Sequence, residues 1–95
     1  MSMGVEYRVT GMACPAIVSR LIGLFAAQAI VLERIEVTRH GDCVSVTIVH
    51  AVPYDAQAER FADKMRAIVT VTSVAVYECP AYALEPEFDR AKLSL

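Results

Sequence analysis

The fold follows from one stretch in the middle of the chain, residues 30–50, which reads IVLERIEVTRHGDCVSVTIVH. Its first half has strand character, and its second half alternates apolar and polar residues, which is the period of a half-buried strand. The apolar positions of the second half are Val44, Val46 and Ile48. The two halves are joined by a turn of His40, Gly41 and Asp42. The stretch therefore predicts a β-hairpin with one apolar face.

Working outward, the sequence predicts one strand and one helix on each side of this region. VEYRVT at 5–10 alternates as a strand that ends at Gly11, and a helix is expected over 15–29. Beyond Pro53, Asp55 is a plausible N-cap for a second helix, and a last strand is expected over 70–77. The inward faces of the helices are predicted to be Ile17, Leu21, Leu24 and Phe25 in the first, and Ala58, Phe61, Met65 and Ile68 in the second.

The predicted order is β-α-β-β-α-β, which places the chain in the α+β class. One four-stranded antiparallel sheet with both helices on one face satisfies right-handed crossovers and buries every apolar stripe, as in the ferredoxin-like fold. We expect this domain to span 4–78. The remainder, 79–95, is expected to be a tail that forms either a short helix near 87–93 or an arm that wraps a partner.

Composition excludes several functions. The chain has 95 residues and a net charge of -2, and its nine Lys and Arg residues form no basic stripe, so nucleic acid is not an expected partner. Its longest apolar stretch is too short to cross a bilayer, and it opens on no secretory signal, so no membrane role is expected. Three cysteines without a C-x-x-C pair fit reduced thiols in the cytoplasm.

Catalytic patterns are also missing from the sequence. The two histidines, His40 and His50, lie at opposite ends of one predicted strand and have no paired nucleophile. The four glycines are too far apart for a phosphate loop. We therefore expect a non-catalytic protein that needs no cofactor.

The loop GMACPAI at 11–17 raises the question of a metal site. It resembles the first four positions of the G-M-x-C-x-x-C loop of heavy-metal-associated copper chaperone domains, but Ile17 replaces the second cysteine. The predicted topology brings this loop and the hairpin turn to the same end of the sheet, so Cys14, His40 and Cys43 are the alternative ligand set for zinc or copper(I). The favoured interpretation is that Cys14, Cys43 and Cys79 are simply packed as small apolar side chains and hold no metal.

A longer resemblance begins at 15–37, PAIVSRLIGLFAAQAIVLERIEV. This stretch resembles the opening of an ACT domain, a small amino-acid-sensing module, and in particular the short, single-ACT form of the regulatory small subunit of acetolactate (acetohydroxyacid) synthase. The second helix and last strand, FADKMRAIVTVTSVAVYE at 61–78, are similar as well. The residues in register with the family are Ser19, Arg20, Gly23, Leu24, Phe25 and Glu33.

The resemblance implies a ligand pocket that has lost its polar groups. The expected pocket residues are Ala13, Cys14, Pro15, Ala16, Ile17 and Val31. Ala13 and Val31 stand where the family has asparagines, and Ala16 stands where it has a glycine. A buried amino acid would leave its charges underpaired there. We therefore expect valine feedback to be weakened or absent if an amino-acid effector binds at all.

The resemblance also implies partners. ACT domains of this type pair side by side, and the apolar edge at 30–37 favours such a homodimer. The expected interface is Arg20, Leu24, Ile30, Leu32 and Arg34; the alternative is that Ile30, Leu32 and Ile35 pack under the helices of their own chain. A second implied partner is the catalytic large subunit of acetolactate synthase. A stand-alone sensor of a less polar small molecule is the alternative function.

Overall fold

The computed structural model describes residues 3–51 and 56–80, and the predicted hairpin lies at one side of its sheet. Strands β2 (Arg34–His40) and β3 (Cys43–His50) pair antiparallel from Arg34 opposite Val49 to His40 opposite Cys43. Gly41 in the turn has a φ of 61°, a conformation that favours glycine. The hairpin prediction is confirmed.

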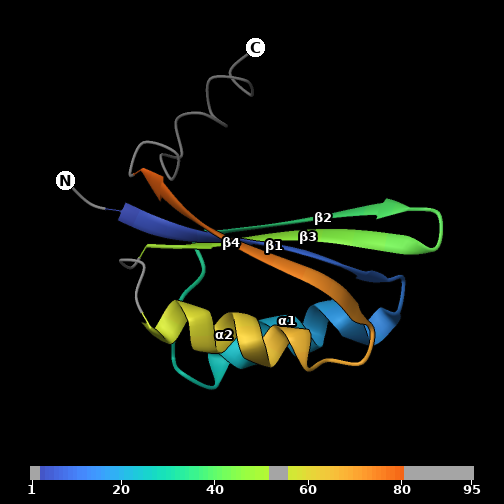
Figure 1. Cartoon of the computed structure of the whole chain (residues 1–95), viewed down its shortest axis with the longest axis horizontal. Coiled ribbons are helices and arrows are strands. Elements are labelled where there is room, and N and C mark those ends of the chain that lie inside the picture. The colour runs from blue at the N-terminus through green and yellow to red at the C-terminus, as the bar shows by residue number, and fades with distance from the viewer. Residues whose placement is uncertain (1–2, 52–55, 81–95) are drawn as a thin grey trace, which may run out of the picture.

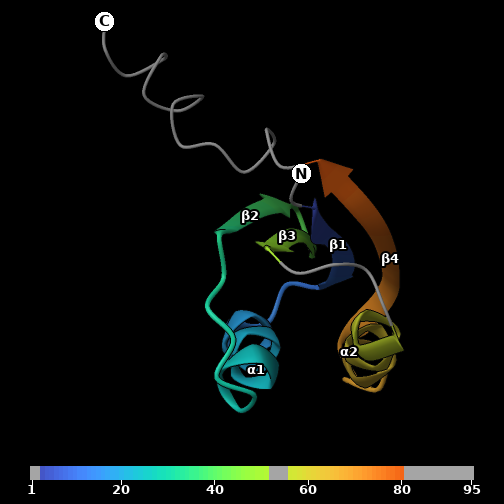
Figure 2. The ribbon, with the colours of Figure 1, turned by 90° about the vertical axis from the view of Figure 1, so that its left-hand side faces the viewer.

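Two longer strands complete the sheet. Strand β1 (Met3–Met12) pairs antiparallel with β3 on one side and with β4 (Val71–Pro80) on the other. The strands form one layer (Figure 1), and their order is β2-β3-β1-β4, with β1 and β3 at the centre and β2 and β4 at the edges (Figure 2).

Both helices lie on the same face of the sheet. Helix α1 (Pro15–Ala26) and helix α2 (Ala56–Arg66) run side by side below the strands (Figure 2). The predicted α+β, ferredoxin-like βαββαβ fold is confirmed. On the opposite face, which we call the outer face, no helix or strand of the described residues covers the sheet.

The core fills the space between the sheet and the two helices. Its largest members are Tyr7, Phe25, Ile17, Leu21, Ile48 and Met65. His50 is buried among the aromatic rings, with its Nε2 atom 3.0 Å from the hydroxyl of Tyr7. Phe25 lies edge-on to Tyr7 and stacks on Phe61 at 4.7 Å between ring centroids. These contacts join β1, β3 and both helices.

The connection from α1 to β2 differs from the prediction. Helix α1 ends at Ala26 rather than 29, because Ala29 adopts a φ of 57° and Ile30 N donates to Phe25 O, which closes the helix. Strand β2 begins at Arg34 rather than 30. Ile30 and Leu32 therefore lie in the connection, half-buried against the chain's own core. The edge available for pairing is shorter than expected.

Smaller differences concern the other boundaries. Gly11 does not end β1 but lies within it, one residue before its last. Helix α2 ends at Arg66, so that Ile68 packs on the core from the turn that follows. The N-cap proposed at Asp55 and the helix proposed near 87–93 lie outside the described residues. Within 3–51 and 56–80, no helix is long and apolar enough to cross a membrane.

Candidate functional site

An open groove lies between the beginning of α1 and the hairpin, on the helix side of the sheet. Its volume is about 310 Å³. The β1–α1 loop and the first turns of α1 form one wall, while β2 and β3 form the other. The lining residues are Ala13, Cys14, Pro15, Ile17, Val18, Val37, Arg39 and Val44.

Backbone hydrogen bonds fix the loop wall of this groove. Met12 N donates to Thr70 O and Ala13 N donates to Asp42 O, both at 2.8 Å, so the loop is tied to two neighbouring turns. Cys14 is extended and occupies the N-cap position, and Pro15 then begins the helix with its fixed φ. The loop is therefore held in one position beside β2.

The chemistry of the groove is apolar with one cation. Arg39 is its charged lining residue, and its Nε donates to Gly41 O at 2.8 Å, which orients the guanidinium. The first turn of α1 carries no acidic residue, so no side-chain charge there offsets the positive end of the helix dipole. An acyl group with one negative charge suits these walls, whereas the lining side chains hold no carboxylate or amide to accept hydrogen bonds from an ammonium group.

The structure brings four of the six predicted pocket residues into this groove: Ala13, Cys14, Pro15 and Ile17. Ala16 is half-buried and does not line the groove, and its carbonyl accepts a hydrogen bond from Ser19 Oγ at 3.1 Å. Val31 does not line the groove; it is 81% exposed in the connection before β2. That position follows from the late start of β2.

The sequence did not predict the other four lining residues, which are Val18, Val37, Arg39 and Val44. A signal for two of them was present, because Val37 and Arg39 alternate with outward-facing residues and so point to the helix side of an edge strand. Val37 is nevertheless 49% exposed, which shows that α1 leaves this part of β2 uncovered.

The structure does not bring the alternative metal ligands together. Cys43 and His40 are opposite each other in the hairpin and share the outer face, whereas Cys14 lines the groove on the helix side. Among the residues that the structure describes, no group of three or more His, Cys, Asp or Glu side chains is placed to hold a metal ion. The expectation that this set comes close together is wrong.

Neither histidine occupies a catalytic arrangement. His50 is 1% exposed and contacts Tyr7 inside the core, where no substrate reaches it. His40 is exposed at the end of β2. The structure thus gives His50 a packing role.

The residues expected at a dimer interface are spread over α1 and the β2 region. Arg20 is exposed on α1, and Leu24 is half-buried there against the core. Ile30 and Leu32 pack on the same core, as the alternative interpretation had it. Arg34 lies on the outer face. Strand β2 is an edge strand of the sheet, so the backbone N–H and C=O groups on the side away from β3 remain available for pairing.

Comparison with known proteins agrees with this fold. A profile of the ACT-like domain family matches residues 1–83, and the chain belongs to that family. ACT domains are generally regulatory, ligand-binding modules. A search of curated protein sequences finds no match.

Solved structures show the same fold at low sequence identity. The ACT domain of GTP pyrophosphokinase from Chlorobium tepidum superimposes with a TM-score of 0.69 at 13% identity, covering 81% of this chain and 100% of that domain. The C-terminal domain of the MgtC protein from Mycobacterium tuberculosis gives 0.69 at 17% identity, over 84% and 94% of the two chains. An ACT domain protein from Streptococcus pneumoniae gives 0.63 at 15% identity, over 82% and 91%.

Proposed function

We propose that this chain is a non-catalytic regulatory protein whose groove between α1 and β2 binds a small, largely apolar carboxylate. The observation that carries the proposal is the groove itself, which combines aliphatic walls with the single cation Arg39. Its volume of about 310 Å³ lies at the lower end of the range for small-molecule sites. A short branched acid fits that size.

The same lining disfavours a free amino acid. Valine carries an ammonium group that would lose water without gaining an acceptor side chain, at a cost of about 1–3 kcal/mol. This cost corresponds to roughly a 10- to 100-fold weaker binding. The proposal therefore includes weakened or absent feedback by valine.

Calorimetric titration of the chain with valine and with 3-methylbutanoate tests this selectivity, since the two ligands differ only by the ammonium group. We expect 3-methylbutanoate to bind at least about 10-fold more tightly. Arg39→Gln should weaken that binding, while the matched variant Arg60→Gln on the exposed side of α2 should not. Tighter binding of valine, or equal binding to the Arg39→Gln variant, would contradict the proposal.

A pair of substitutions tests whether the groove is a degraded amino-acid pocket. The variant Ala16→Gly with Val31→Asn reintroduces the glycine and one asparagine that the family resemblance places there. Gain of valine binding would identify a family pocket that has lost its polar groups. An unchanged preference for 3-methylbutanoate would identify a rebuilt site, as in a stand-alone sensor, and Val31, at 81% exposed, favours this outcome.

The proposal includes a homodimer in which β2 of each chain pairs at its open edge. Val37 supports it, because a half-exposed valine on an edge strand favours burial against a partner. Val37→Lys should halve the mass observed by sedimentation velocity, because a lysine there blocks edge pairing. Val69→Lys adds the same charge at a valine that is 90% exposed after α2, and should leave the mass unchanged. Equal masses for the unaltered chain, Val37→Lys and Val69→Lys would exclude edge pairing.

A more specific proposal is that the enzyme regulated by this chain is acetolactate synthase. Its support is the Ser19-Arg20 and Gly23-Leu24-Phe25 run on α1, which is similar to the enzyme's small subunit. Titration of the chain into the large subunit of the same organism should raise the rate in a saturable way, and valine should not suppress the rise. Suppression by valine would contradict the account of Ala13, Ala16 and Val31. No effect at any ratio would favour the stand-alone sensor.

A further inference from the structure

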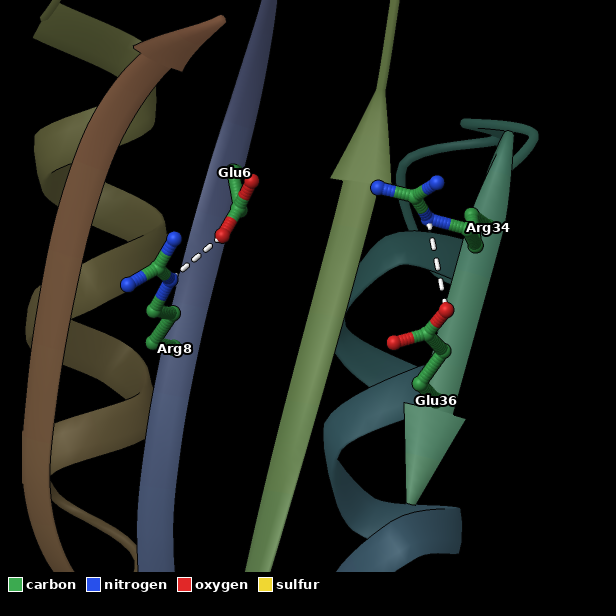
Figure 3. A network of polar contacts seen from close by, with 4 residues as sticks. All are labelled: Glu6, Arg8, Arg34 and Glu36. Atoms are coloured by element: carbon green, nitrogen blue, oxygen red, sulfur yellow. Dashed lines mark hydrogen bonds and ion pairs between the residues drawn. The ribbon is translucent and has the colours of Figure 1, made fainter. Parts of the chain in front are cut away.

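Four charged side chains form a compact pattern on the outer face (Figure 3). Glu6 and Arg8 lie on β1, and Arg34 and Glu36 lie on β2, with β3 between the two strands. We call these four residues the charge quartet. The strand register places Glu6 level with Arg34, and Arg8 level with Glu36. Opposite signs therefore alternate both along each strand and across the sheet.

Each strand pairs its own two charges only in part. Arg8 Nε donates to Glu6 Oε2, and this hydrogen bond, together with the attraction of the two charges, raises the pKa of Arg8. Arg34 Nε lies 3.8 Å from Glu36 Oε2 and makes no hydrogen bond within the described part of the chain. The side chains of Arg8 and Glu36 remain 62% and 63% exposed, so both can meet a partner, whereas Arg34 is 36% and Glu6 only 14% exposed.

We propose that a second copy of this chain packs on the outer face and pairs each charge of the quartet with its opposite. The quartet has two positive and two negative charges, so it presents no net charge to a phosphate, a membrane surface or a nucleic acid. A complementary surface must instead alternate positive and negative charges in the same way. The spacing of its charges must match that between β1 and β2, and that between every second residue along a strand. The outer face of another copy has this pattern by construction.

Two-fold symmetry makes the match explicit. A two-fold axis that runs along β3 brings β2 of the second copy over β1, which places its Arg34 against Glu6 and its Glu36 against Arg8. An axis across the strands, between the two rows, instead places Arg34 against Glu36 and Glu6 against Arg8. Both axes keep the strands of the two sheets aligned, as in face-to-face sheet packing. The quartet lies within about 5 Å of β3 on either side, so sheet twist displaces it little.

The surroundings of the quartet support burial by a flat partner. Val49 lies on β3 between Glu6 and Arg34 and is itself fully buried, so a partner would meet the charged side chains and not Val49. The Arg8 guanidinium lies 4.7 Å from the centre of the Tyr77 ring, which is 46% exposed. An ordered cation and an exposed aromatic ring at one border are typical of protein–protein contacts.

Mixing two charge-reversed chains tests the proposal. Arg8→Glu and Glu36→Arg each place like charges against each other in a self-pair, so each should weaken outer-face association about 100-fold and halve the mass at low ionic strength. If the axis runs along β3, a mixture of these two variants restores every ion pair. If the axis crosses the strands, the restoring mixture is Glu36→Arg with Arg34→Glu.

Restoration of the mass in one of these mixtures, measured by native mass spectrometry, would support the proposal and select the axis. Failure of both mixtures, or an unchanged mass for Arg8→Glu alone, would overturn it. The control variants Glu59→Arg and Arg60→Glu make the same charge changes on the exposed side of α2 and should leave the mass unaltered. Circular dichroism confirms that each variant is folded. The edge pairing proposed above does not involve this face, and Val37→Lys tests it separately.

Discussion

Gly11 lies where β1 comes closest to the turn before β4. A Cβ atom there would lie 2.5 Å from Thr70 O and 2.6 Å from Ile17 Cδ1. Because the backbone oxygen has no freedom to move aside, Gly11→Ala should lower the free energy of unfolding by about 1–3 kcal/mol. Gly23→Ala is the matched control: nothing lies within 4 Å, and alanine in a helix should raise stability by about 0.5–1 kcal/mol. Urea denaturation that ranks the two variants in the opposite order would contradict this packing.

The three cysteines should differ in their reactivity. Cys79 is 5% exposed on the outer face, and burial raises the pKa of its thiol, to which the charge of Glu6 adds. Cys43 is exposed, and Cys14 is half-buried in the groove. We expect a thiol reagent to modify Cys43 first and Cys79 last in the folded protein, since the thiolate is the reacting form. Equal rates for all three would contradict the burial of Cys79.

The raised pKa of Cys79 also sets the direction of a pH effect on stability. The folded chain holds this proton more tightly than the unfolded chain, so its contribution to stability is complete below the ordinary thiol pKa of about 8.5. That contribution is lost as pH rises through the higher pKa of the folded state. Denaturation at rising pH should therefore show a smaller loss of stability for Cys79→Ala than for the unaltered chain.

At the scale of an element, the turn that follows α1 contains a strained residue. Ala29 has a φ of 57°, which costs an L-residue about 1–2 kcal/mol. Ala29→Gly should therefore stabilise the protein by about 0.5–1 kcal/mol. Ala27, with a φ of -63°, gives the control, since Ala27→Gly should destabilise by up to about 1 kcal/mol. Thermal unfolding measures both, and an equal effect of the two changes would argue against the left-handed end of α1.

The elements themselves were predictable where apolar periodicity was strong. Val44, Val46 and Ile48 alternate, and they mark β3 and its buried face. The start of β2 was not predictable, because the apolar run at 30–32 has strand character. In the structure the hydrogen bond from Ile30 N to Phe25 O closes α1, and Ile30 and Leu32 then pack on the core. Tertiary packing overrode local preference there, and this displaced Val31 from the expected pocket.

At the scale of the whole molecule, the sequence order βαββαβ indicated the architecture, but the site depends on what the helices leave uncovered. The sequence placed Cys14 and Ile17 beside a ligand, whereas Arg39 enters the groove only because α1 does not cover that part of β2. The charge quartet likewise arises from β1 and β2, which are distant in sequence and meet through β3. Strand register, which the sequence alone did not provide, creates both surfaces.

The central claim is that the groove between α1 and β2 is the ligand site, and amide chemical-shift mapping with 3-methylbutanoate tests it most directly. The account predicts saturable shifts at Cys14, Ile17, Val18, Val37, Arg39 and Val44, with valine producing much smaller shifts at equal concentration. Shifts that gather on the outer face, or no saturable shift with either ligand, would contradict it.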